Sequence, residues 1–133
     1  MKTMKRIAAL VMALALVFAL AACGSGREEQ QGGAAGMEKI NVKKAQMLYD
    51  VLDASKLFTV SAEKGSRSFM NVTFRSPSDE MDAKFVAESV KAGFTNLKGH
   101  RSVGGMRASI YNAMPMEGVE KLCEFIQKFE KEN

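Results

Sequence analysis

The 133-residue sequence contains no tryptophan, one histidine, two cysteines and two prolines. One histidine and two widely separated cysteines do not supply the clustered ligands that a zinc site requires, so we expect no metal. No second histidine or base-orienting carboxylate accompanies Ser102 or Ser109, which argues against a serine hydrolase. No Gly-x-Gly-x-x-Gly or Gly-Lys-Ser/Thr string follows a predicted strand, so a nucleotide-binding loop is not indicated either.

The excess of positive charge is concentrated at the N-terminus. The whole chain carries 19 Lys and Arg against 15 Asp and Glu, a net charge of +4. Lys2, Lys5 and Arg6 account for three of these cations, and the remainder of the chain has a net charge of only +1. No basic run with interleaved aromatics occurs, so we expect no nucleic-acid partner.

Residues 1–22 have the pattern of a bacterial lipoprotein signal peptide. A basic start precedes an unbroken apolar run at residues 7–22, and Leu20-Ala21-Ala22 lies directly before Cys23. Small residues before a cleavage point are typical of secretory signals, and Cys23 is the residue that such a signal would lipidate. The alternative is an uncleaved membrane helix. The apolar run is shorter than the roughly 20 residues that cross a bilayer, which favours the signal peptide. Use of the signal would anchor the protein on the extracytoplasmic side of a membrane.

The composition then changes twice. Residues 23–37 are rich in glycine and polar side chains, and we expect a flexible linker there. Residues 38–133 carry the apolar periodicity of one small domain. The pattern predicts helices over residues 38–54, over about 79–92 and from Pro115 onward, and strands over residues 57–60, 70–75, 94–97 and 107–111.

These elements predict an α+β fold with a small, mostly antiparallel sheet and helices on one face. Each predicted helix has an apolar face that we expect to be buried, and Cys123 is interpreted as apolar filler within the last of them. The predicted inward residues are Ile40, Met47, Leu48, Val51 and Leu52, then Met81, Phe85, Ser89 and Val90, then Val119, Leu122, Cys123, Ile126 and Phe129.

The most informative stretch for function is residues 98–116. His100 and Arg101 follow a glycine, Gly104-Gly105 allows a sharp turn, and Arg107 begins the last predicted strand. Arginine binds carboxylate and phosphate groups at two points, so a turn that gathers these side chains predicts recognition of a small dianion. The alternatives are a solvated basic loop for His100-Arg101 and an ion-paired edge arginine for Arg107. Tyr111-Asn112 is interpreted as support for the turn.

The string Gly-His-Arg-x-Val-Gly-Gly-x-Arg-Ala-Ser-x-Tyr-Asn-Ala, with Asn71-Val72-Thr73-Phe74-Arg75 upstream, resembles the C-terminal small domain of the phosphoserine aminotransferases. The resemblance covers residues 43–130, roughly the last quarter of a family member. It implies that His100 and Arg101 bind the substrate phosphate and that Arg107 binds the substrate α-carboxylate. The family is cytoplasmic, homodimeric and dependent on pyridoxal phosphate, and it transfers an amino group between glutamate and 3-phosphohydroxypyruvate in serine biosynthesis.

No lysine here matches the family's Schiff-base lysine, and no segment matches its large cofactor domain. The resemblance therefore predicts a C-terminal fragment that is inactive alone, holds no catalytic residue and binds no pyridoxal phosphate. It also predicts an exposed apolar patch where the large domain or a dimer partner would rest. Two alternatives remain open: a lipid-anchored binding module for a small phosphorylated or carboxylate ligand, and an inert tethered domain.

Overall fold

A computed structural model describes residues 33–133 of the chain. The predicted signal at residues 1–22 and the predicted lipidation site Cys23 lie outside the described residues. Within residues 33–133, no helix combines the length and the hydropathy needed to cross a bilayer. The segment Met37–Asn133 forms one structural unit, and it carries every element that follows α2.

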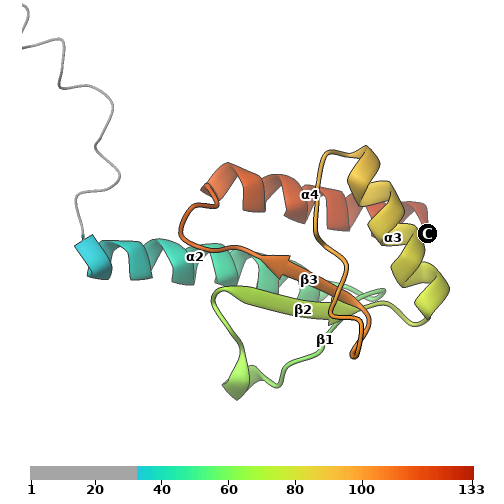
Figure 1. The fold of residues 1–133 in the computed structure, drawn as a ribbon, viewed down its shortest axis with the longest axis horizontal. Helices are drawn as coiled ribbons and strands as arrows, with labels where there is room; N and C mark the ends of the chain where they lie inside the picture. The colour runs from blue at the N-terminus through green and yellow to red at the C-terminus, as the bar shows by residue number, and fades with distance from the viewer. Residues whose placement is uncertain (1–32) are drawn as a thin grey trace, which may run out of the picture. The chain divides into compact units, whose positions relative to one another are not determined.

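The described residues contain three α-helices, one short 3₁₀ helix and three strands (Figure 1). Their order is α2 (Gly33–Ala54), β1 (Thr59–Val60), η1 (Lys64–Ser66), β2 (Asn71–Arg75), α3 (Asp79–Lys91), β3 (Met106–Ser109) and α4 (Met116–Glu132).

The strands form one antiparallel sheet in the order β1-β2-β3. Side chains alternate along each strand, so one face of the sheet is buried and the other is open. Val72 and Phe74 of β2 and Met106 and Ala108 of β3 belong to the core, together with residues from all three helices. The helices therefore cover one face of the sheet, and the predicted α+β architecture is confirmed.

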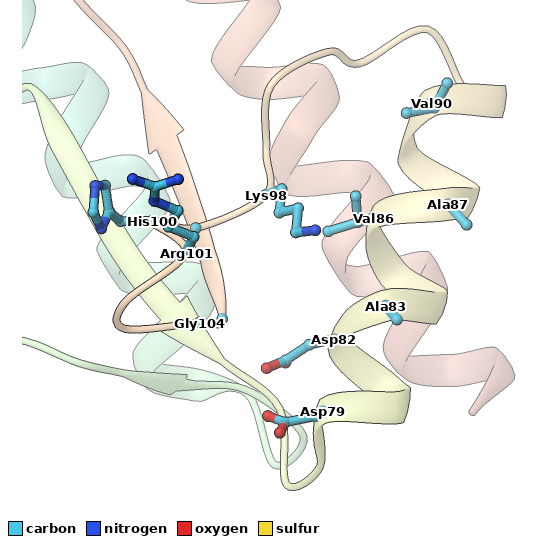
Figure 2. Close-up of a pocket in the computed structure, with 12 residues that line it drawn as sticks. Asp79, Asp82, Ala83, Val86, Ala87, Val90, Lys98, His100, Arg101 and Gly104 are labelled. Carbon is cyan, nitrogen blue, oxygen red and sulfur yellow. The ribbon is translucent and has the colours of Figure 1, made fainter.

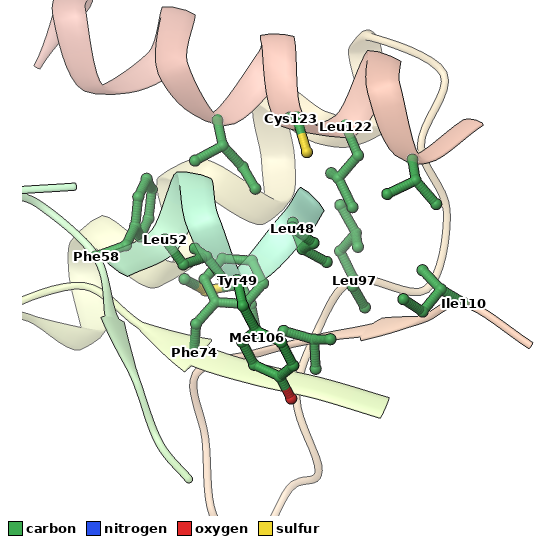
Figure 3. Packing of buried hydrophobic residues seen from close by; sticks show 14 of the residues in the cluster. Leu48, Tyr49, Leu52, Phe58, Phe74, Leu97, Met106, Ile110, Leu122 and Cys123 are labelled. Atoms are coloured by element: carbon green, nitrogen blue, oxygen red, sulfur yellow. The ribbon is translucent and has the colours of Figure 1, made fainter. Parts of the chain in front are cut away.

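An aromatic cluster fills the centre of this core. The ring of Phe85 lies within 6 Å of the rings of Phe58, Phe74 and Phe129, in mostly edge-to-face contacts. Side chains from α2 lie between α4 and the strands (Figure 3). The whole predicted stripe of α4 is buried, as the spacing of its apolar residues required.

Helix α2 begins earlier than the sequence indicated. It starts at Gly33, so residues 33–37 of the predicted linker are helical, which corrects that boundary. The reason is local: Ala34 and Ala35 are the strongest helix formers, and extending an existing helix adds one hydrogen bond per residue. On the inner face, Leu48 and Leu52 are buried as expected, whereas Met47 and Val51 are only partly buried.

Two other expectations for the middle of the chain are wrong. Residues 94–97 are not a strand, because Gly93 and Asn96 take left-handed φ angles of 93° and 61° that break an extended path. Only an isolated bridge between Lys98 and Met106 connects this region to β3. Val90 of α3 is 58% exposed rather than buried, since Phe85 and Ser89 mark the inward face of that helix.

Helix α3 begins at a cap, as the string Ser76-Pro77-Ser78-Asp79-Glu80 predicts from its serines, its proline and its acidic residues. The side chain of Ser78 accepts a hydrogen bond from the backbone N–H of Met81, at 3.2 Å. Asp82, in the first turn, accepts bonds from both the backbone N–H and the hydroxyl of Ser76, at 2.7 and 2.6 Å. This pair fixes the chain direction between β2 and α3, which form the two sides of the site described next.

Large apolar side chains are also exposed in the described residues. They are Val42, Phe69, Val90, Val103, Tyr111 and Met114. They come from α2, α3 and three loops, and whether they meet a further domain or a partner stays a prediction.

Candidate functional site

The segment between α3 and β3 is a closed turn held by main-chain bonds. The Gly99 N–H donates to the carbonyl of Gly105 at 2.8 Å, and the Arg107 N–H donates to the carbonyl of Leu97 at the same distance. At the tip, the N–H groups of Val103 and Gly104 both donate to the carbonyl of His100, at 2.9 and 2.8 Å. The turn is therefore shaped by its backbone and needs no ligand to define its path.

Glycine is required at two positions of this turn. Gly105 has a φ of 66°, and a Cβ there would lie 2.8 Å from the carbonyl oxygen of Phe74. A Cβ at Gly99 would overlap the carbonyl oxygen of Gly104. Since these obstacles are backbone atoms, no side-chain rotation relieves them.

His100 and Arg101 project from the turn and are exposed. The Ser102 N–H donates to Nδ1 of His100 at 3.3 Å, and the Ser102 hydroxyl lies 2.6 Å from the same nitrogen. Because Nδ1 accepts the backbone bond, the hydrogen of the neutral ring lies on Nε2. His100 thus offers an N–H donor to the solvent side, next to the guanidinium of Arg101.

Arg75 fastens this turn to the sheet. It lies at the end of β2 on the open face, and its Nη2 donates to the carbonyl of Val103 at 2.8 Å. A Cβ at Gly105 would also lie 3.3 Å from the Cβ of Arg75, so the turn packs closely over this side chain.

A cavity of about 540 Å³ lies between the turn and α3. Its α3 wall combines Asp79 and Asp82 with small apolar side chains, and the opposite wall includes Lys98. Figure 2 shows the Lys98 amine directed toward α3 and the side chains of His100 and Arg101 directed away from it. The two carboxylates offset the cations that line the cavity, so its charge does not favour an anion. His100 and Arg101 also line this cavity, at the side formed by the turn.

Arg107 lies on the open face of the sheet. It pairs with Thr73 of β2, alternates with the buried Met106 and Ala108, and is itself partly buried. Its Nε is buried and has no hydrogen-bond partner. The Nε of Arg67 is likewise buried without a partner although its guanidinium is paired with Asp53, so an unpaired Nε does not by itself mark a binding site.

The structure places the three predicted anion-binding side chains on two segments. His100 and Arg101 share the turn, while Arg107 lies on the sheet and does not line the cavity. The reason is the alternation of β3, which directs every second side chain to the open face. Three basic residues near these segments were not predicted from the sequence: Arg75, which binds the turn, Lys98, which lines the cavity, and Lys44, which is buried in α2. The signal for Lys44 was its position four residues from both Ile40 and Leu48 on the predicted apolar face.

Within residues 33–133, no three His, Cys, Asp or Glu side chains come close enough together to hold a metal ion. Cys123 is buried, and burial together with Glu120 and Glu124 raises the pKa of its thiol to about 11. It is therefore no nucleophile at neutral pH.

The sequence profile of the aminotransferase class-V family matches residues 16–122. A phosphoserine aminotransferase of Desulfosudis oleivorans is 52% identical over 106 residues, which cover 80% of this chain and 29% of that protein. A phosphoserine aminotransferase of Streptococcus suis is 56% identical over 103 residues, covering 77% of this chain and 28% of the relative. The chain therefore spans about three tenths of the length of the curated relatives that it matches.

Solved structures show the same fold. A phosphoserine aminotransferase from Bacillus circulans subsp. alkalophilus superposes with a TM-score of 0.76 at 47% identity, over 78% of this chain and 29% of that one. A phosphoserine aminotransferase with bound pyridoxal phosphate, from Trichomonas vaginalis, superposes with a TM-score of 0.70 at 39% identity, over 74% and 29% of the two chains.

Proposed function

Because the chain belongs to the class-V aminotransferase family, we propose that it supplies the substrate-binding small domain of a phosphoserine aminotransferase. In this role His100 and Arg101 bind the phosphate of the substrate and Arg107 binds its α-carboxylate. The substrates are then phosphoserine or 3-phosphohydroxypyruvate and glutamate. The observation that carries the proposal is the pair of outward donors on a turn whose backbone is already closed.

The geometry supports the division of work between these side chains. Nε2 of His100 and the guanidinium of Arg101 are adjacent donors, which suits the several oxygens of a phosphate. Arg107 is partly buried on the open face of the sheet, and a guanidinium can bind a carboxylate at two points. Both groups are on surfaces that the core does not use.

The described residues do not fit pyridoxal phosphate. Schiff-base chemistry needs a lysine amine free to react, and Lys44, the one buried lysine in the described part of the chain, has all three of its hydrogens bonded to carbonyl oxygens. Every other lysine there is exposed. We therefore assign the cofactor to the part of the family fold that residues 33–133 do not correspond to, and we expect the chain alone not to transaminate.

The test titrates the full chain with two ligands that share a phosphate and an ammonium and differ in a carboxylate. Backbone amide NMR shifts report binding of O-phosphoserine and O-phosphoethanolamine. With few donors facing water, we expect a Kd in the millimolar range, near −4 kcal/mol. Arg107→Ala should weaken O-phosphoserine only, Arg101→Met should weaken both ligands, and Lys91→Met, an exposed cation on α3, should change neither.

Two results would contradict the proposal. An absence of shifts at tens of millimolar O-phosphoserine would favour an inert domain. Borohydride trapping of pyridoxal phosphate on one lysine, together with amino transfer from glutamate by the purified chain, would show that the cofactor assignment is wrong. Binding of both ligands without regard to Arg107 would favour the second candidate, a binding module for phosphorylated ligands.

We also propose that residues 1–22 act as a lipoprotein signal and that Cys23 carries the lipid, which would place the domain at a membrane surface. Metabolic labelling with an alkyne fatty acid in a bacterial host should mark the wild-type chain and not Cys23→Ser. Equal labelling of both would rule out Cys23 as the attachment site.

A further inference from the structure

Lys44 of α2 is completely buried, and its ammonium is enclosed by main-chain carbonyls. Nζ donates to the carbonyl oxygens of Tyr111 at 2.8 Å, Met114 at 2.9 Å and Ile110 at 3.3 Å. Three acceptors can use all three hydrogens of an ammonium, whereas a neutral amine has only two, so this set of contacts favours the charged form. Burial lowers the pKa of Lys44, and the three carbonyl dipoles act in the opposite direction.

A second contact from the same helix joins the same segment. Asn41, one turn before Lys44, donates from Nδ2 to the side-chain oxygen of Asn112 at 2.7 Å. Residues 110–114 have no regular secondary structure of their own beyond a turn. Their path is therefore set by α2, through a buried charge and a side-chain hydrogen bond.

The held segment reaches the open face of the sheet through Tyr111. Its hydroxyl donates to Oδ1 of Asn71 at 3.0 Å, and the hydroxyl of Ser109 donates to the same oxygen at 3.1 Å. Asn71 pairs with Ser109 in the sheet, and the next pair on this face is Thr73 with Arg107. Lys44 thus holds the backbone of Tyr111, and Asn71 holds its hydroxyl at the strand pair next to that of Arg107.

We propose that Lys44 is a positioning residue for carboxylate binding by Arg107. By fixing the carbonyl of Tyr111, it sets where the Tyr111 side chain crosses the open face and thereby limits the directions available to the Arg107 guanidinium. This inference rests on the proposed function, because it needs a carboxylate at Arg107. It does not involve the phosphate donors, which are on the separately closed turn.

The experiment uses the same two ligands with the full chain. Lys44→Met keeps an unbranched side chain one atom shorter and removes the charge, and Lys43→Met makes the same change at an exposed position of α2. We expect Lys44→Met to weaken O-phosphoserine roughly threefold to tenfold. O-Phosphoethanolamine should stay within about twofold of its wild-type Kd, a selectivity that general damage to the fold would not produce. Lys43→Met should bind both ligands as the wild type does.

The outcomes separate this inference from the proposed function. If the wild type does not bind O-phosphoserine, both fail. If the wild type binds through Arg107 but folded Lys44→Met binds equally well, or loses both ligands equally, only the positioning role is overturned. Should Lys44→Met not fold by circular dichroism, the exposed variants Tyr111→Phe and Asn112→Ala test the same connection. Both variants must weaken binding of O-phosphoserine and leave binding of O-phosphoethanolamine unchanged. If they do not, the inference is wrong.

Discussion

Gly99→Ala is the sharpest perturbation that the structure offers for the turn. A Cβ at Gly99 would overlap the carbonyl oxygen of Gly104 and lie 2.8 Å from the carbonyl oxygen of Gly105. Both obstacles are main-chain atoms of the opposite arm. The alanine therefore fits only if the two arms separate.

Separation of the arms breaks two hydrogen bonds, each 2.8 Å long: Gly99 N–H to Gly105 and Arg107 N–H to Leu97. At about 0.5–1.5 kcal/mol net for each bond, the loss is about 1–3 kcal/mol. Restriction of the unfolded chain by alanine returns about 0.4–1 kcal/mol. The expected net loss of about 1–2 kcal/mol lowers Tm by roughly 5–15 °C in a domain of this size.

The assay is thermal unfolding of the full chain followed by circular dichroism, with Gly65→Ala as the matched control. Gly65 has open space around its Cβ position and no left-handed φ, so its alanine variant should unfold at or slightly above the wild-type Tm. Equal Tm values for the two variants would refute the claim that the backbone alone closes this turn. Gly99→Ala should also weaken O-phosphoethanolamine, because His100 and Arg101 lose their relative placement.

Three further predictions concern Cys123 and Arg75. With a thiol pKa near 11, about one in a hundred Cys123 side chains is ionised at pH 9. Iodoacetamide should therefore label Cys123 far more slowly in the folded Cys23→Ser chain than in the same chain unfolded by urea. Equal labelling rates would contradict the burial of Cys123. A raised thiol pKa stabilises the fold below pH 9, and this contribution is lost as the pH rises from 9 to 11. The free energy of unfolding should therefore fall less between pH 9 and pH 11 in Cys123→Ala than in the parent chain. Arg75→Met should release the Val103 carbonyl and weaken O-phosphoethanolamine several-fold in the NMR titration without unfolding the sheet, and an unchanged Kd would show that Arg75 does not position the turn.

The sequence predicted the fold well where the apolar residues follow a single helical or strand spacing. The apolar spacing of α4 left a single possible inward face, and all five residues of that stripe are buried. Alternation in β2 likewise placed Val72 and Phe74 in the core. The cap of α3 was also readable, because a serine before acidic residues has a direct chemical role at a helix start.

The errors occurred where backbone conformation or a buried polar group outweighed the apolar pattern. The apolar character of residues 94–97 favoured a strand, but the left-handed Asn96 turns the chain there, and nothing in the apolar pattern of the sequence reveals a single φ angle. Ser89 is buried as predicted, and polar Asp82 is buried because its carboxylate accepts hydrogen bonds from Ser76. Asp82, Phe85 and Ser89 define the inward face of α3, and Val90, one residue further along the helix, faces outward.

The backbone around the proposed donors is held in place within the described residues, but the donors are open on one side. The turn carrying His100 is closed by its own backbone, and the strand carrying Arg107 is fixed by β2 on one side and by Lys44 through residues 110–114 on the other. Yet His100 and Arg101 are exposed, and Arg107 is only partly buried. A ligand held there is in contact with water on at least one side, where charge-assisted bonds are weakened by screening. Under the proposed function, strong binding therefore requires a second surface opposite the open face of the sheet, and we propose that this domain's contribution is to fix where the phosphate and the carboxylate lie.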